Sequence, residues 1–234
     1  MPVDPAANIE ISAFAWVPPF AQGLVRDLRV RWALEEAGFP YRERLLGAID
    51  ERTQDYFLEQ PFGQVPIYNE GEVRMFETGA IVLHVAERSE VLMPRDPAGR
   101  ARAMSWVFAS LSSVEPVVME LAAIDLFHSG AEWARARRPE AERKVRERLG
   151  RLSDWLGNRG HLEDRFTAGD LMMTTMLRIL RHTDLVAERP SLARYQARCE
   201  ARLASDGAGG AARAVCDPRT RRRGVTDFSS KERR

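Results

Sequence analysis

The chain has 234 residues, 44% of them hydrophobic and 29% charged, which is typical of a globular protein large enough for two modest domains. Its 35 basic and 34 acidic residues leave a formal net charge of +1, so overall charge gives no case for binding nucleic acid or an anionic membrane. Two cysteines and four scattered histidines form no CxxC pair and no metal-ligand spacing. A disulfide framework, dithiol redox chemistry and a metal site are therefore not expected.

The first residues contain no basic region followed by an apolar stretch, so no signal peptide is predicted. No uninterrupted apolar run approaches the roughly 20 residues of a membrane-spanning helix. We therefore expect a cytoplasmic protein without a membrane or nucleic-acid partner.

The first 88 residues predict a mixed α/β region in the order β-α-β-α-β-β-α. Two prolines and a glycine make residues 16–23 a loop, and Gly38 with Pro40 ends the helix that follows it. The strands are expected at 9–15, 41–46, 66–68 and 73–76, and the helices at 24–37, 50–59 and 77–88.

Two prolines and a glycine in residues 89–99 predict a linker to a region that is helical throughout, residues 100–204. Apolar residues from Met104 to Ala122 trace one face of a long helix. Pro139 suits the first position of a helix over 140–156, and Thr167 with Asp170 has the spacing of a capping box for the next. A fourth helix is predicted within 189–203.

Residues 205–234 are rich in Gly, Ala, Arg and Ser and lack apolar periodicity, so they predict a disordered tail. Its basic run RTRRRG suits a solvated tail better than a nucleic-acid site.

A possible ligand site lies in the segment from Gly63 to Arg88. Glu77 and Thr78 open a helix, where free backbone amides and the helix dipole attract a carboxylate. Thr78 adds a hydroxyl donor, and Glu77 adds an acceptor for an ammonium group. The alternative is that both residues only stabilise the helix start.

The chain resembles the cytosolic glutathione S-transferase family over residues 9–203. The resemblance is carried, in the family's order, by RVRWALEEAGFPY (29–41), PFGQVPIY (61–68), ETGAIVLHVAER (77–88) and FTAGDLMM (166–173). It implies a thioredoxin-like domain over 1–88 and an all-helical domain over 100–204. It also implies glutathione as co-substrate and a homodimer in which each thioredoxin-like domain faces the partner's helical domain.

The resemblance assigns the glutathione site residue by residue. In the family the proline that matches Pro66 is cis, which leaves the backbone of Val65 free to pair with the cysteinyl part of glutathione. Glu77 and Thr78 would hold the γ-glutamyl end, and Gln64 the glycine end. The alternative for Val65-Pro66 is a plain edge-strand proline.

The sequence departs from the family where the thiol should be activated. The family uses Tyr, Ser or Cys, and alignment on Arg29 and Val30 puts Leu24 at that position, where no side-chain donor exists. Three substitutes remain open. The loop could bring Ser12, Trp16 or Gln22 to the thiol, Arg26 could stabilise a thiolate by its charge, or backbone amides could act alone.

In the family, the electrophile lies against the first long helix of the second domain. The candidate pocket residues there are Ser105, Trp106, Phe108, Ala109, Ser112 and Ser113. The leading hypothesis is transfer of glutathione to small apolar electrophiles. The alternatives are a non-catalytic glutathione-binding or scaffold protein of the same fold, and a glutathione-dependent disulfide reductase or peroxidase.

Overall fold

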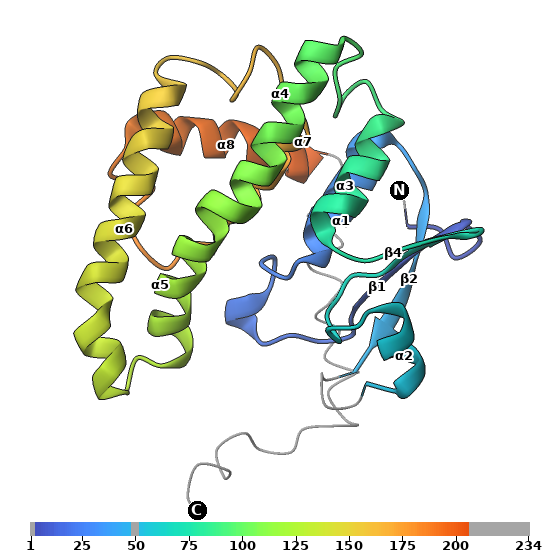
Figure 1. Cartoon of the computed structure of the whole chain (residues 1–234), viewed down its shortest axis with the longest axis horizontal. Helices are drawn as coiled ribbons and strands as arrows, with labels where there is room; N and C mark the ends of the chain where they lie inside the picture. The colour runs from blue at the N-terminus through green and yellow to red at the C-terminus, as the bar shows by residue number, and fades with distance from the viewer. Residues whose placement is uncertain (1–2, 48–51, 206–234) are drawn as a thin grey trace, which may run out of the picture.

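The computed structural model describes residues 3–47 and 52–205. It places a small sheet with flanking helices beside a group of longer helices (Figure 1). The expected tail over 205–234 lies outside the described residues from position 206 onward, as does the start of the helix expected at 50–59.

The N-terminal half confirms the expected element order. Its strands are β1 (Ile9–Phe14), β2 (Tyr41–Leu46), β3 (Tyr68–Glu70) and β4 (Val73–Met75), and its helices are α1 (Asp27–Ala37), α2 (Gln54–Glu59) and α3 (Thr78–Glu87). The strand order is β2-β1-β3-β4, with β1 parallel to β2 and antiparallel to β3. This mixed sheet with a parallel crossover is the thioredoxin-like arrangement that was expected.

The helix expected from Leu24 begins later, at Asp27. Residues 22–26 form turns, and a single 3-10 turn, η1 (Pro19–Ala21), interrupts the loop before them. The C-terminal end of α1 is as predicted, because Gly38 takes a left-handed conformation with φ of 71° and donates its N–H back to Glu35. The loop therefore continues to Arg26, the residue immediately before the first residue of α1.

The C-terminal half is built from helices only. They are α4 (Pro97–Phe108), the π-helical segment η3 (Ala109–Val114), α5 (Glu115–Phe127), α6 (Glu132–Leu156), α7 (Ala168–Ile179) and α8 (Pro190–Ser205). Helix α4 begins at Pro97, inside the expected linker, because Asp96 caps it by accepting the Gly99 N–H.

The predicted start of α6 was wrong. Helix α6 begins at Glu132, so Pro139 lies inside it rather than at its first turn. The apolar positions Ala134, Ala141 and Val145 are all fully buried, so tertiary packing continues the helix through the proline. The capping box of α7 was correct: Thr167 and Asp170 make both reciprocal bonds.

Helices α4, η3 and α5 run on as one helix over Pro97–Phe127, which by length and composition alone could cross a membrane. Glu115, Glu120 and Asp125 interrupt its apolar runs, as expected, so it meets this criterion only by its average composition. In its most apolar stretch, 44% of the residues are buried inside the protein, and the helix packs on α3, α6 and α7. This burial is typical of a core helix.

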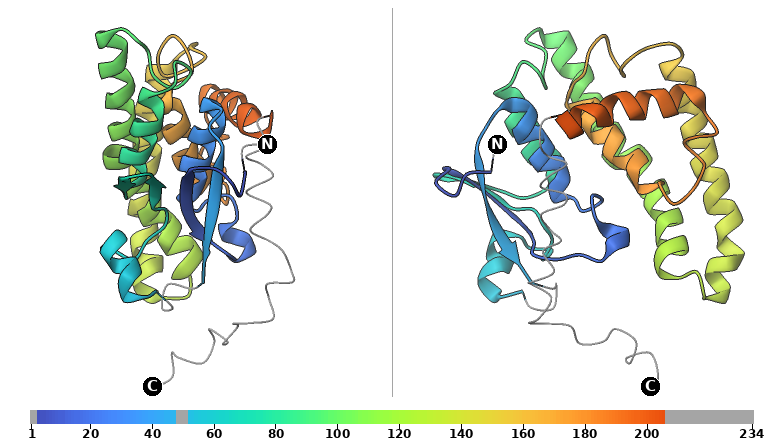
Figure 2. Two further views of the ribbon diagram at one scale, coloured as in Figure 1. Left: turned by 90° about the vertical axis from the view of Figure 1, so that its right-hand side faces the viewer. Right: turned by 180° about the vertical axis from the view of Figure 1, so that it is seen from behind.

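The two halves share one interface. Helices α1 and α3 of the sheet layer both pack on the central helix α7, and α3 also contacts α4. Figure 2 shows from behind that the loop before α1 extends from the sheet towards the helical half. Side chains from the helical half can therefore reach the loop and the start of α1.

Candidate functional site

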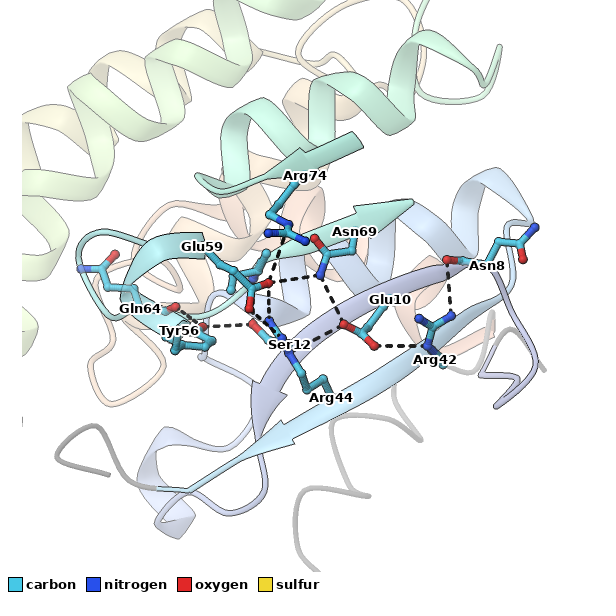
Figure 3. A network of polar contacts seen from close by, with 11 residues as sticks. Asn8, Glu10, Ser12, Arg42, Arg44, Tyr56, Glu59, Gln64, Asn69 and Arg74 are labelled. Carbon is cyan, nitrogen blue, oxygen red and sulfur yellow. Dashed lines mark hydrogen bonds and ion pairs between the residues drawn. The ribbon is translucent and has the colours of Figure 1, made fainter. Parts of the chain in front are cut away.

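The Val65–Pro66 peptide bond is cis, as the resemblance implied. Val65 is buried, yet within residues 3–47 and 52–205 neither its N–H nor its C=O has a hydrogen-bond partner. Both neighbours are held. The C=O of Gln64 accepts from the Tyr56 hydroxyl at 2.5 Å (Figure 3). The N–H of Ile67 donates to Ser12 Oγ at 2.8 Å. The Val65 backbone is thus a free edge between two fixed points, which suits pairing with an extended peptide.

Glu77 and Thr78 open α3 with an unusual backbone. Glu77, the residue before the helix, has φ of 70° and ψ of 114°, a region that costs a residue with a side chain on the order of 1–3 kcal/mol. The Glu77 side chain is exposed, and its C=O accepts the N–H of Ile81 to begin the helix. Such strain persists where the surrounding structure fixes it, and here it directs an acidic side chain to the surface beside a helix N-terminus.

Thr78 is buried beneath this turn and contacts α1. Its Oγ1 accepts a hydrogen bond from Arg29 Nη1 at 3.3 Å. Because a guanidinium only donates, the Thr78 hydroxyl hydrogen is not used in this bond and can serve a further acceptor. The first amides of α3 lie beside it, so this corner offers several donors to a carboxylate.

Two arginines and one glutamate form the charged centre of the site. Glu115, on α5, accepts from Arg29 at 2.8 Å and 3.2 Å and from Arg26 at 3.3 Å. Arg29 and Glu115 are buried, whereas Arg26 is partly exposed at the start of α1. Burial raises the pKa of Glu115, but the hydrogen bonds and charges of Arg29 and Arg26 outweigh it, so the net pKa lies below its ordinary value of 4.5.

This centre joins the predicted residues. Arg26 Nη1 donates to Gln64 Oε1 at 3.1 Å, so the start of α1 touches the residue before Val65. Through Glu115 and Arg29 the same cluster reaches Thr78. Gln64, Val65, Thr78 and Arg26, predicted from separate stretches, therefore surround one place.

Sequence reasoning missed two members, Arg29 and Glu115. Arg29 was used only to set the alignment of the first helix. Glu115 is an acidic residue within an otherwise apolar stretch, SSVEPVVM, and an isolated charge on a core helix is a signal for a buried partner.

The four residues suggested for thiol activation lie in different surroundings. Gln22 lies in the turn after η1, where its carbonyl oxygen accepts from Arg181. Ser12 is buried at 1% exposure, and its hydroxyl is bonded to the Ile67 N–H and to Tyr56. Trp16 is 44% exposed in the loop before η1. Among these four in the described part of the chain, Arg26 is the one whose side chain bonds to Glu115 and Gln64.

The loop that carries Trp16 and Leu24 is fastened to the helical half. From the end of α7, Arg181 donates to the carbonyl oxygens of Phe20 and Gln22 at 2.7 Å and 2.8 Å. The Phe20 ring meets Phe127 edge-on at 5.6 Å between centroids. The helical half therefore sets the position of the loop.

The structure places the expected electrophile-pocket residues in different surroundings. Trp106 packs on Trp155 and donates its Nε1–H to Glu163, so it faces other helices of its own half. Within residues 3–47 and 52–205, no hydrogen bond or ion pair joins the other pocket candidates to the charged centre; these are Ser105, Ala109, Ser112 and Ser113. Phe108 is exposed at the end of α4, seven residues before Glu115.

No group of three or more His, Cys, Asp or Glu side chains that could hold a metal ion occurs in the described part of the chain. The candidate site is therefore a set of hydrogen-bond donors, charges and one free backbone edge.

Comparison with known proteins places this site in a family context. Residues 22–87 match the model of the glutathione S-transferase N-terminal domain. A glutathione S-transferase from Hyoscyamus muticus is 28% identical over 78 residues, which is 32% of this chain and 37% of that protein. Glutathione S-transferase 4 from Zea mays is 31% identical over 85 residues, 35% of each chain. The matched region spans little more than a third of these curated relatives.

Solved structures share the fold over most of the chain. A glutathione transferase family member from Pseudomonas fluorescens with two glutathione molecules bound has a TM-score of 0.73 at 18% identity, over 85% of this chain and 91% of that one. A glutathione transferase from Burkholderia graminis, also with two glutathione molecules bound, has a TM-score of 0.74 at 22% identity, over 92% of this chain and 89% of that one. Ure2p in complex with glutathione has a TM-score of 0.75 at 19% identity, over 90% of this chain and 96% of that one. At these identities the likeness shows the fold.

Proposed function

We propose that the protein binds glutathione and transfers it to small apolar electrophiles, because residues 22–87 match the glutathione S-transferase N-terminal domain and the chain shares the fold of solved glutathione transferases. The observation that carries this proposal is the convergence of a free Val65 backbone edge, the α3 N-terminus and the Arg26–Arg29–Glu115 cluster. The two-domain organisation over 1–88 and 100–204 is part of the same proposal.

Each end of the tripeptide has a complementary group. The Val65 N–H and C=O pair with the cysteinyl residue as a short added strand. The γ-glutamyl carboxylate takes the first amides of α3 and the Thr78 hydroxyl, and its ammonium takes Glu77. Gln64, bonded to Arg26, supports the glycine end.

The thiolate is stabilised by charge in this proposal, because Leu24 offers no hydroxyl or thiol. Arg26 stands at the N-terminus of α1, where the helix dipole also favours an anion. A thiol of ordinary pKa near 8.5 is mostly protonated at neutral pH, and a nearby cation increases its thiolate fraction. The thiol proton passes to solvent, the sulfur forms a bond to the electrophilic carbon, and a leaving group such as halide departs with its bonding electrons.

Binding is tested on immobilised glutathione. The wild-type protein should be retained, and the double variant Glu77→Ala, Thr78→Ala should elute, because it loses the ammonium acceptor and the hydroxyl donor together. Isothermal titration with free glutathione gives the affinity of each protein. Equal retention of the double variant would remove Glu77 and Thr78 from the site.

Turnover with an aromatic halide separates the transferase from a non-catalytic binding or scaffold protein, the alternative that Leu24 favours. Arg26→Met should lower kcat at saturating glutathione, by up to a few hundredfold if it acts as the principal activating donor. Binding without conjugation by wild type across several electrophiles would favour the scaffold. A disulfide reductase or peroxidase has less support, because such classes use a cysteine where this chain has Leu24.

We also propose a homodimer as the working assembly, which the family resemblance implies. An exposed apolar patch on the sheet layer supports it. Leu58 and Phe62 are 85% and 68% exposed, and Phe62 meets Phe76 edge-on at 6.3 Å between ring centroids. Apolar side chains gathered in this way are typical of a surface that another protein covers.

A further inference from the structure

Ser12 and Tyr56 connect the sheet to both sides of the Val65–Pro66 segment. We propose that Ser12 and Tyr56 are positioning residues for glutathione binding. Their hydroxyl groups hold the Val65 backbone edge in the geometry with which the tripeptide pairs. This inference rests on the proposed function and assigns to Ser12 a role different from the thiol activation considered from sequence.

The four hydrogen-bonding groups have only one consistent order of donors. The Ile67 N–H can only donate and the Gln64 C=O can only accept, so they fix the two ends. The Tyr56 hydroxyl has one hydrogen and donates it to the Gln64 C=O, so its oxygen accepts the hydrogen bond from the Ser12 hydroxyl at 3.1 Å. Ser12 in turn accepts from Ile67. The chain runs from Ile67 through Ser12 and Tyr56 to Gln64, and every donor in it is used.

This chain closes over Val65 and Pro66. Gln64 precedes Val65 and Ile67 follows Pro66, so the hydroxyl pair bridges the two ends of the segment that presents the free edge. Figure 3 shows the part of this bridge formed by Ser12, Tyr56 and Gln64. A second bond, from the Ser12 N–H to the Ile67 C=O at 3.0 Å, fixes the Ile67 end further. The Gln64 end has no such backbone support among the described residues and depends on Tyr56 and on the Arg26 contact to its side chain.

Tyr56 is itself rigidly placed. Thr53 caps the short helix α2 by accepting the Tyr56 N–H, so the helix start and the tyrosine share one anchor. The Tyr56 ring lies beneath the guanidinium groups of Arg44 and Arg52, at 5.7 Å and 5.0 Å from its centroid. Glu59 holds Arg44 through two bonds of 2.9 Å and 3.0 Å.

The surroundings shield this series of hydrogen bonds from water. Ser12 and Tyr56 are both buried, so water is poorly placed to replace a deleted hydroxyl. Burial also raises the pKa of Tyr56, so the phenol remains a neutral donor through the pH range of ordinary assays. Loss of either hydroxyl should therefore loosen the segment rather than rewire it.

The test uses the full chain with Tyr56→Phe and Ser12→Ala, measured well below the unfolding temperature so that every variant is folded by circular dichroism. Each should bind glutathione about five- to tenfold more weakly, because each removes the side-chain bond that holds one end of the Val65–Pro66 segment and the bond between the two hydroxyl groups. In turnover, KM for glutathione should rise while kcat at saturating glutathione stays unchanged. The double variant should lose less binding free energy for glutathione than the two single variants lose in sum, because both hydroxyl groups belong to one series of hydrogen bonds.

Tyr68→Phe is the matched control. Its hydroxyl is also buried in the sheet layer, where it donates to Glu70 and accepts from Arg88, away from Val65. This variant should change stability but leave the glutathione affinity unchanged. Amide hydrogen exchange adds a local readout, since Ser12→Ala should speed exchange at Ile67 and Tyr68→Phe should not.

Three outcomes would overturn the inference. Folded Tyr56→Phe and Ser12→Ala that bind glutathione as wild type does would reduce both residues to a structural role. Equal weakening by Tyr68→Phe would show a general effect of lost buried hydroxyls. Absence of glutathione binding by wild type would overturn the proposed function together with this inference, which is distinguishable from the first two results.

Discussion

Among single residues, Glu115 has a direct electrostatic role at the site, because it is the buried counter-charge for Arg29 and also binds Arg26. Glu115→Gln would leave the Arg29 guanidinium buried without a full negative charge. Removal of one partner from a buried ion pair costs about 3–5 kcal/mol. We therefore expect this variant to lower the free energy of unfolding, measured by urea denaturation at pH 7, by about 3 kcal/mol, with glutathione binding weakened as Thr78 loses its support.

Glu120→Gln is the control, since Glu120 lies on the same helix but pairs with Arg137 at the surface. An exposed pair is worth about 0–1 kcal/mol, so this variant should unfold nearly as wild type does. Equal stability losses in the two variants would contradict a special role for the buried pair.

The same residue predicts a pH dependence. Arg29 and Arg26 hold the pKa of Glu115 below 4.5 in the folded protein. A carboxylate with a depressed pKa stabilises the fold above its unfolded-state value and loses this contribution as pH falls through its folded-state value. The stability difference between wild type and Glu115→Gln should therefore be constant from pH 5 to 7 and shrink below about pH 4. A difference that grows on acidification would refute this assignment.

At the site, local motifs could be predicted and distant partners could not. The cis Val65–Pro66 bond and the helix start at Thr78 were expected from short stretches, the first through the family resemblance and the second from its neighbouring residues. Glu115 lies 86 positions from Arg29, and only the packing of the two halves brings them together. Trp106 was named as a pocket candidate because it lies on the first long helix of the second domain, but the partners of its ring depend on helix packing that one sequence does not specify.

At the scale of elements, close approach of α4 and α7 depends on Gly169. A Cβ at this position would lie 2.5 Å from the Cβ of Trp106 and 3.4 Å from the carbonyl oxygen of Ala103. Both atoms are fixed to the α4 backbone, so one helix has to move. Gly169→Ala should therefore lower the free energy of unfolding by about 1–3 kcal/mol, the usual cost of overpacking, as measured by chemical denaturation.

Gly79→Ala in α3 provides the contrast. Its Cβ would also approach a neighbour to 2.5 Å, but this neighbour is Leu111 Cδ1, the far end of a flexible side chain. A rotamer change relieves the contact, and alanine gains up to about 1 kcal/mol in helix propensity. The variant should be close to wild type in stability. Destabilisation larger than that of Gly169→Ala would show that side-chain flexibility does not decide the outcome.

Element types were predictable where composition and capping agree. The α7 capping box and the Gly38 end of α1 were placed correctly, because each depends on residues within one turn. The start of α6 was misplaced because Pro139 reads locally as a helix start, whereas burial of Ala134 and Ala141 extends the helix on both sides. Tertiary burial outweighs a local breaker here, and the sequence pattern alone does not show the partner surface.

For the whole molecule, the helical half acts on the sheet layer at two points. Glu115 binds the arginines at the start of α1, and Arg181 binds the loop before it. Together they fix both ends of the segment from Phe20 to Arg29. The geometry available to activate a thiol therefore depends on contacts between the halves and not on the thioredoxin-like layer alone.

The proposed homodimer gives the prediction at the largest scale. In this proposal a second copy covers the patch of Leu58, Phe62 and Phe76. Phe62→Ser replaces an apolar side chain at that contact with a polar one and should weaken the dimer. Light scattering after size exclusion should then show the mass shift from twice the chain mass towards that of the monomer. Trp133→Ser is the control, because Trp133 is also exposed but lies on α6, away from the sheet layer. A wild-type monomer across micromolar concentrations would refute the dimer. A dimer that persists in Phe62→Ser but dissociates in Trp133→Ser would move its interface to α6.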